Sequence, residues 1–303
     1  MTVALSPMCL PRARSLTDAL TAPSAGPAPV LDPVLRSSLS DGLARLESRL
    51  LAGRRLRVDE YLLSTAGAYG PTAPGSASTE PFRWSARTAR RSVGLAAVRA
   101  CYHGIHRTPA EAVAGVLERL AEDAGGSTGR GGSLGRWLAG LPSGARAAVQ
   151  ADAVTWATRL HIALDWDSLP PGTVVGGRDE WWDCPSARRI GLRGRAEVRT
   201  STAGGDASAA GPHRPVLFCL RPGVPGPTGR TELALPALVA ALASPTGAPP
   251  ARVIGWWPAC GRAIVLEVDE KVLTRAAASV VGAVGARLGA GLGGGARKEA
   301  TAR

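Results

Sequence analysis

The sequence predicts an α/β fold, in which a mainly helical N-terminal region precedes a mixed central sheet flanked by helices. From about residue 32 to residue 166, apolar side chains recur at helical spacing, as they do on the buried face of an amphipathic helix. After Pro170-Pro171-Gly172 the pattern changes to short apolar runs bounded by glycine and proline, which are typical of strands. Helical patterns recur between and after these runs, so we expect a sheet in the C-terminal half that helices cover.

The first half of the chain predicts helices in order along the sequence. Residues 1–30 are rich in Pro, Ala and Ser and are expected to be a disordered segment. Ser85 is suited to cap one helix, and Thr108 followed by Pro109 is typical of another helix start. Further segments follow from composition and periodicity: a helix at 32–52, a short strand or extended lead-in at 54–64, loops at 65–80 and 125–135, and a long helix ending at Trp166.

The second half predicts three consecutive strands, a helix, two strands and a final helix. The strands are expected at 172–182, 188–200, 215–220, 251–257 and 262–268. The intervening helix, 230–243, should be kinked by Pro236. A final helix is expected from about Asp269 to Leu288, followed by a flexible glycine-rich tail. The chain is therefore divided into a segment 1–30, a mainly helical region 31–168, an α/β core 169–288 and a tail 289–303.

The positive charge of the chain is carried almost wholly by arginine. The 303 residues have a formal net charge of +12, and only Lys271 and Lys298 of the 36 basic residues are lysines. The excess follows either from codon bias in a GC-rich genome or from a requirement to bind polyanions. In both cases a mechanism that needs a catalytic lysine has two candidates.

The cysteines do not predict a metal site. They are odd in number and widely spaced, and none forms a CxxC or Cys/His pattern with zinc spacing; they are Cys9, Cys101, Cys184, Cys219 and Cys260. This usage favours a reducing, cytoplasmic location. The N-terminus lacks the continuous apolar segment of a signal peptide, and no window approaches 18 consecutive apolar residues, so we expect no membrane span.

Two short motifs carry a resemblance to a known family. The words LRGRAEV (192–198) and VLFCLRPG (216–223), followed by the helix RTELALPALVAALA, resemble the PD-(D/E)XK nuclease superfamily in its RecB-like branch, over roughly residues 81–285. The resemblance implies a restriction-endonuclease-like core. It aligns Glu197 with the family's first metal-binding acid, Cys219 with the second acid and Arg221 with its lysine. The family's histidine would fall at Leu95.

These departures predict a degenerate active site. Phosphodiester hydrolysis in this family needs Mg²⁺, which prefers oxygen ligands, and the sulfur of Cys219 is a poor substitute. Arg221 can contact a phosphate but cannot give up a proton. We therefore expect no metal cofactor and lean towards a protein that is not an enzyme. Glu197 itself is either a relic ligand or an outward strand residue opposite Arg195 or Arg199.

Three functions remain open from the sequence. The leading one is a catalytically inactive nuclease-fold protein that binds DNA or RNA through surface arginines, namely Arg87, Arg91, Arg193, Arg195 and Arg221. The second is a residual Mg²⁺/Mn²⁺ nuclease that uses Glu197 with Asp179 or Glu180. The third is a scaffold that binds a protein partner and no nucleic acid.

Two tryptophan pairs have a structural and a functional interpretation. Neighbouring residues on a strand point to opposite faces, so one ring in each of the pairs 181–182 and 256–257 is expected in the core. The other ring of a pair, if exposed near arginines, could stack on a base.

Overall fold

The computed structural model describes residues 13–22, 30–60, 62–63, 84–124, 130–176, 179–201, 214–221 and 223–299. Within these residues the chain folds into helices and two mixed sheets, which confirms the predicted α/β class. The helices are α1 (Ala13–Thr21), α2 (Pro33–Glu47), α4 (Ala86–Tyr102), α5 (Pro109–Asp123), α6 (Arg130–Ala139), α7 (Ser143–Ala163), α8 (Gly229–Ala243) and α9 (Glu270–Glu299), with a single 3-10 turn at Trp166–Ser168.

The larger sheet has five strands in the order β2-β5-β6-β7-β8. Its strands are β2 (Val174–Val175), β5 (Val198–Ser201), β6 (Pro215–Leu220), β7 (Arg252–Trp257) and β8 (Arg262–Glu267). β6 and β7 are parallel and are joined through α8, whereas the other neighbours are antiparallel. A smaller sheet has the order β1-β4-β3, formed by β1 (Leu56–Val58), β4 (Ile190–Gly194) and β3 (Glu180–Asp183).

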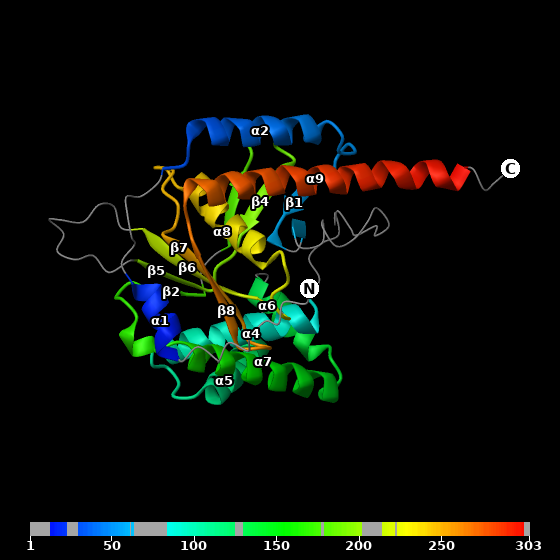
Figure 1. Ribbon diagram of the computed structural model, residues 1–303. Coiled ribbons are helices and arrows are strands. Elements are labelled where there is room, and N and C mark those ends of the chain that lie inside the picture. The colour runs from blue at the N-terminus through cyan, green and yellow to red at the C-terminus, as the bar shows by residue number, and fades with distance from the viewer. Residues whose placement is uncertain are drawn as a thin grey trace, which may run out of the picture.

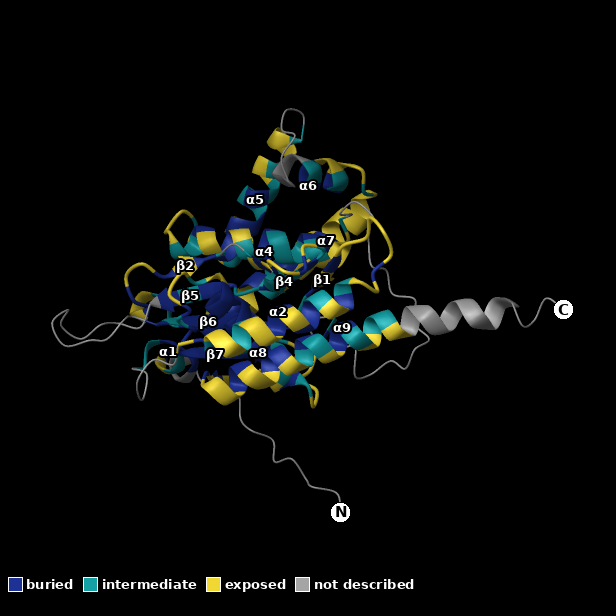
Figure 2. Cartoon of the chain, turned by 90° about the horizontal axis from the view of Figure 1, so that it is seen from above, coloured by how far each residue is buried: buried dark blue, intermediate teal, exposed yellow. Residues whose placement is uncertain are grey.

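The five-stranded sheet separates two hydrophobic cores. Leu217 and Cys219 of β6 face a core shared with α2, α8 and α9, and Val216, Phe218 and Leu220 face a core shared with α1, α4, α5, α6 and α7. The alternation of side chains along a strand produces this division. In Figure 1 the two groups of helices lie on opposite sides of the sheet, and in Figure 2 strand β6 is buried. Residues before and after 168 therefore share both cores.

The predicted helix starts are confirmed at two positions. Ser85 and Thr88 form a reciprocal capping box at α4, and Thr108 and Glu111 form one at α5 with Pro109 in the first turn. Each box satisfies backbone donors that the first helical turn leaves unpaired. Pro236 lies inside α8 without ending it.

Two predicted strands are each wrong in extent. The segment 172–182 contains β2 and β3, and the segment 188–200 contains β4 and β5, with one strand of each pair in each sheet. The chain crosses between the sheets at the breaks, one of which contains Gly176 with φ of +76°. Residues with that backbone conformation are usually glycine because a Cβ would be strained there.

Helical structure is also found where disorder or loops were expected. α1 lies within the segment 1–30, where Leu16 and Leu20 are buried one turn apart, so the average composition concealed a short amphipathic helix. α6 occupies residues 130–139 and so begins inside the expected loop 125–135. α9 continues to Glu299 in place of the expected tail from 289. The expected loop 65–80 lies outside the described residues.

Part of α9 is long and apolar enough to cross a membrane by length and composition. This part is Glu270–Gly289, and 39% of its apolar 18-residue window is buried inside the protein. Its buried side chains pack in the core that α9 shares with α2 and α8. Such packing is a sufficient reason for its apolar composition, since the core face of a helix must be apolar.

Candidate functional site

The candidate site lies at the end of β6, where the chain before β5 brings Glu197 alongside. The Glu197 backbone amide donates to the Phe218 carbonyl at 2.8 Å, which continues the pairing of β5 with β6. Its side chain extends further along β6, where Oε2 accepts a hydrogen bond from the Leu220 backbone amide at 2.5 Å. The sheet register therefore brings together the three positions of the family resemblance, Glu197, Cys219 and Arg221.

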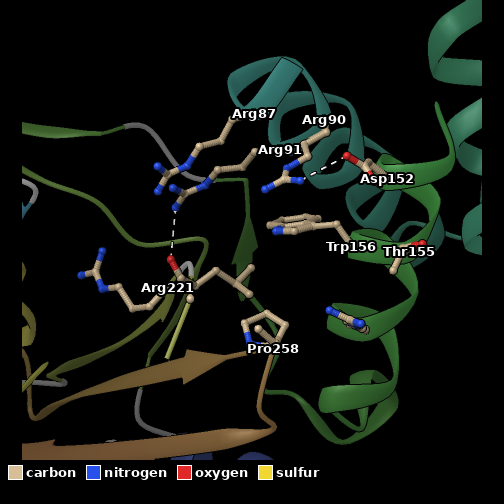
Figure 3. Close-up of a pocket in the computed structure, with 12 residues that line it drawn as sticks. Arg87, Arg90, Arg91, Asp152, Thr155, Trp156, Arg221 and Pro258 are labelled. Carbon is tan, nitrogen blue, oxygen red and sulfur yellow. Dashed lines mark hydrogen bonds and ion pairs between the residues drawn. The ribbon is translucent and has the colours of Figure 1, made fainter. Parts of the chain in front are cut away.

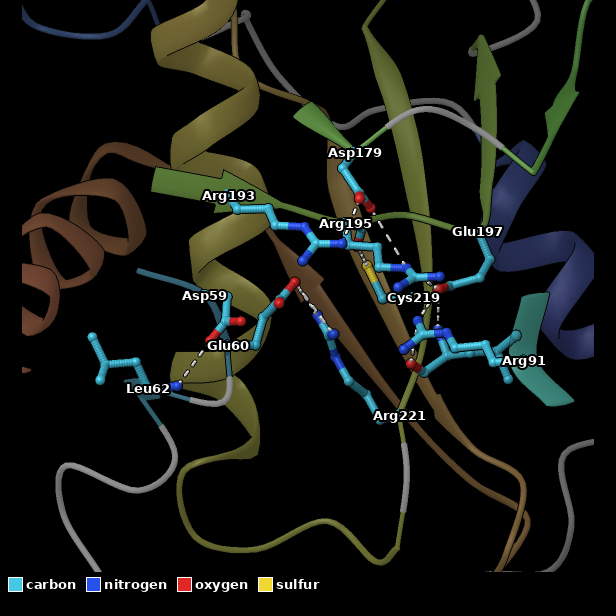
Figure 4. Close-up of polar contacts among 11 residues, drawn as sticks. Asp59, Glu60, Leu62, Arg91, Asp179, Arg193, Arg195, Glu197, Cys219 and Arg221 are labelled. Atoms are coloured by element: carbon cyan, nitrogen blue, oxygen red, sulfur yellow. Dashed lines mark hydrogen bonds and ion pairs between the residues drawn. The ribbon is translucent and has the colours of Figure 1, made fainter. Parts of the chain in front are cut away.

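Glu197 is a fully buried carboxylate with two guanidinium partners. None of its surface is exposed, and its Oε1 accepts a hydrogen bond from Arg91 Nη2 of α4 and lies 3.2 Å from Arg195 Nε (Figure 4). The alternative of an outward-facing Glu197 is therefore wrong, although the contact with Arg195 is present. Buried carboxylates are tolerated when they are paired and hydrogen-bonded in this way.

The charge state of Glu197 follows from these contacts. Burial alone would raise the pKa of its carboxyl group, but Arg91, Arg195 and the Leu220 amide together lower the pKa below its ordinary value. Opposite charges and hydrogen bonds to the charged form both favour ionisation. Glu197 is thus an anion whose ligand positions are already occupied by N–H donors.

Cys219 is an inert thiol. It has no exposed surface, its Sγ donates to the Arg195 carbonyl at 3.2 Å, and burial raises the pKa of the thiol to about 12. A thiol with a raised pKa is neither a nucleophile nor a metal ligand at neutral pH. Cys219 packs in the core shared with α2, α8 and α9 as a small apolar side chain.

Arg221 forms a buried ion pair with a residue from the N-terminal region. Only 6% of Arg221 is exposed, and its Nη1 lies 3.3 Å from Oε1 of Glu60, two residues after β1. Burial by itself would lower the pKa of Arg221, but Glu60 together with Cys219, Glu197 and Glu232 outweighs burial and raises the pKa. The guanidinium is therefore permanently charged and held in place.

A third carboxylate completes the cluster. Asp179 pairs with Arg193 and lies 3.6 Å from Arg195. Burial and the neighbouring Arg91 lower the pKa of Arg195, because like charges disfavour each other. Glu180, next to Asp179, pairs with Arg199 instead.

The cluster as a whole is nearly neutral. We define the arginine–carboxylate cluster as four arginines that share three carboxylates: Arg91, Arg193, Arg195 and Arg221 with Glu60, Asp179 and Glu197. One net positive charge remains. Four of the five arginines expected to bind nucleic acid therefore already hold carboxylates, and those carboxylates compete with any phosphate.

A pocket lined by arginines and apolar side chains opens beside the cluster, between α4, α7 and the turn after β7 (Figure 3). It has a volume of about 320 Å³, and Leu220 and Arg221 lie on its wall. Arg87, the fifth predicted arginine, lines it and is exposed. The pocket brings this residue together with Trp156 and Arg159 of α7.

No protein-family model, curated protein or solved structure matched this chain. Within the described residues, no group of three or more His, Cys, Asp or Glu side chains is arranged to hold a metal ion. The function must therefore be inferred from the chemistry of the cluster and of the pocket beside it.

Both tryptophan pairs follow the expected alternation between faces, but only one pair has an exposed ring. Trp182 is buried while Trp181 is 40% exposed, with the guanidiniums of Arg57 and Arg193 at 5.2 and 5.4 Å from its ring. Trp256 and Trp257 are both buried, because β7 is a central strand covered by a core on each face.

The sequence missed three features of this site. Arg91, one turn before Leu95, is the α4 residue that contacts Glu197; Leu95 is only partly buried and lies near Gly176. Glu60 had no detectable signal, since it is 161 residues from its partner. Trp156 and Arg159 did have a signal in the sequence: they are three residues apart on a predicted helix, and residues at that spacing lie on the same helix face.

Proposed function

We propose that this protein binds nucleic acid without cleaving it, on a core that resembles the restriction-endonuclease-like fold. The order of elements supports the second part of this proposal. α4 precedes the antiparallel strands β2, β5 and β6, α8 follows β6, and β7 returns parallel to β6. This is the order of helix, acid-bearing strand, motif strand and following helix that the resemblance implied.

The arginine–carboxylate cluster is the reason why we expect no cleavage. A hydrolytic metal ion needs carboxylate oxygens that are free to coordinate it, and Glu197 and Asp179 both hold guanidiniums. Cys219 provides a neutral, buried thiol at the second acid position. Two positive charges beside Glu197 further oppose a divalent cation there.

The arginine-lined pocket supports binding of a polyanion. Among the described residues, Arg87 and Arg159 make no hydrogen bond or ion pair and are exposed on its rim. Guanidiniums bind phosphate as a planar fork, and the net charge of +12 favours approach of a polyanion from a distance.

The test is to titrate the full chain against labelled single- and double-stranded DNA at two salt concentrations, with parallel incubations in Mg²⁺ and Mn²⁺. We expect binding that weakens steeply with salt, as it does when phosphates are neutralised, and intact DNA after incubation. Absence of binding at low salt would overturn the proposal and favour the protein scaffold. Cleavage that Glu197→Gln abolishes would overturn it in favour of the residual nuclease.

A further inference from the structure

We infer that the pocket between α4 and α7 holds one nucleotide unit of a single-stranded nucleic acid, with a base stacked against Trp156 and two phosphates of the strand bound, one by Arg87 and one by Arg159. This inference rests on the proposed function and assigns it a particular site. Two members of the arginine–carboxylate cluster, Arg91 and Arg221, line the pocket, so the two features are adjacent.

The distribution of charge in the pocket favours an anion. Of the arginines that line it, Arg90 lies 3.2 Å from Asp152 and Arg91 binds Glu197. Arg87 and Arg159 have no such partner among the described residues, and they approach the pocket from different helices. Each of these two guanidiniums lines the same pocket and can bind a phosphate group as a planar fork.

Two buried donors on the pocket wall also need an acceptor. In the described part of the chain, the Nε atoms of Arg91 and Arg221 are buried and have no hydrogen-bond partner. Only 6% of Arg221 is exposed, and it lines the pocket. A buried N–H without an acceptor is unfavourable by a few kcal/mol, so an oxygen-rich ligand would be stabilised at this wall.

Trp156 provides a fixed aromatic surface in the same hollow. Its indole packs so closely on Gly94 of α4 that a Cβ built there would lie 2.5 Å from Cε3 of Trp156. The side chain is nevertheless only partly buried. In the view of Figure 3 the indole lies between the Arg90 guanidinium and Pro258. An indole held in one orientation loses little freedom when a base stacks on it, and every base has a face that can stack.

The recess of this ring favours a single strand over a duplex. Bases in a duplex are stacked inside the helix and must be extruded to reach an aromatic side chain in a pocket. The volume of about 320 Å³ is at the small end of the range for ligand sites, which suits one nucleotide unit.

The experiment measures binding of a labelled oligothymidylate by fluorescence anisotropy at several salt concentrations, with an oligomer of the same length containing abasic positions for comparison. The variants of the full chain are Trp156→Ala, Trp156→Phe and the pair Arg87→Gln with Arg159→Gln. Trp137→Ala is the control for loss of a partly buried tryptophan, because Trp137 of α6 packs against the same core as Trp156 but does not line the pocket. The pair Arg45→Gln with Arg275→Gln is the charge-matched control, because both residues are exposed and lie on α2 and α9, on the opposite side of the sheet.

We expect Trp156→Ala to weaken binding about tenfold, as for loss of one stacked base, and Trp156→Phe to retain most of it. The pocket pair should lower the slope of log affinity against log salt by roughly 1.4, which is about 0.7 for each phosphate of a single strand that the protein no longer neutralises. Both controls should leave the affinity within about twofold of the wild type, once the general effect of the changed net charge on polyanion binding has been subtracted. Abasic positions should weaken binding to the wild type but not to Trp156→Ala, which would couple the base to this ring.

The outcomes separate the two proposals. If the wild-type chain binds no nucleic acid, the proposed function fails and this site fails with it. If the wild type binds but the pocket variants behave as their controls do, the proposed function stands and the pocket assignment is overturned. The abasic comparison on the wild type needs no substitution, so it remains decisive even if Trp156→Ala does not fold; equal binding of both oligomers would overturn the stacking.

Discussion

Removing the charge of Glu197 provides a direct test of the arginine–carboxylate cluster. Glu197→Gln keeps the shape of the side chain and an oxygen for the Leu220 amide, but it removes the anion that Arg91 and Arg195 share. Breaking a buried ion pair by neutralising one partner generally destabilises a protein by about 3–5 kcal/mol, because the other charge stays buried.

The structure places the expected loss near the lower end of that range. The carboxylate is fully buried, but the side chains of Arg91 and Arg195 are 24% and 27% exposed. These guanidiniums can therefore recover part of their hydration in the variant. We expect Glu197→Gln to lower the free energy of unfolding by about 3 kcal/mol at neutral pH. Glu180→Gln is the matched control, since its pair with Arg199 is more exposed at both ends and should contribute less than about 1 kcal/mol.

The assay is equilibrium unfolding in urea, followed by tryptophan fluorescence, at a series of pH values. Because the pKa of Glu197 is lower in the folded protein than its ordinary value, the anion stabilises the fold above the pKa of the unfolded chain. That contribution is lost as the pH falls through the lower folded-state pKa. The difference between wild type and Glu197→Gln should thus be complete at neutral pH and shrink in acid. A loss no larger than that of Glu180→Gln, or a difference that grows in acid, would refute the buried ion-pair argument.

Two further predictions concern packing and thiol chemistry. Gly94→Ala should lower the free energy of unfolding by about 1–3 kcal/mol through overpacking against Trp156. Gly282→Ala is the control: nothing lies within 4 Å of the added carbon, so the free energy of unfolding should rise by up to about 1 kcal/mol. Urea unfolding measures both, and an unchanged stability of Gly94→Ala would contradict the close contact. In the native protein, iodoacetamide should modify the exposed Cys260 and spare Cys219, because burial raises the pKa of the Cys219 thiol to about 12. Mass spectrometry of peptides locates the label. Rapid labelling of Cys219 before unfolding would contradict its burial and show that the end of β6 opens.

Much of the local structure could be predicted from residues that are close in the sequence. The apolar run at 215–220 becomes β6, and Ser85 and Thr108 cap the helices that they precede. The α/β class followed from the same patterns. Hydrophobic periodicity and capping depend on neighbours within a few positions, so a single sequence contains the information that decides them.

The candidate site could be predicted only as a set of positions. Glu197, Cys219 and Arg221 were identified from the sequence, and the pairing of β5 with β6 brings them together. The sequence did not show which charged side chains meet at these positions, because some of their partners come from distant segments of the chain. The partner of Arg221 comes from beyond β1, and one of the two partners of Glu197, Arg91, comes from α4, whereas the other, Arg195, is two residues away in the chain.

The sequence by itself determined the lack of acid-x-lysine chemistry at residues 219–221, because side-chain identity fixes which ligands and protons are available. Tertiary structure alone decided that predicted strands divide between two sheets, that most of the selected arginines hold carboxylates, and that Trp156 meets Arg87 across a pocket. These outcomes depend on contacts between segments far apart in the chain. The energy of a buried charge depends on what surrounds it in space, and that environment exists only after the sheet and its covering helices have packed.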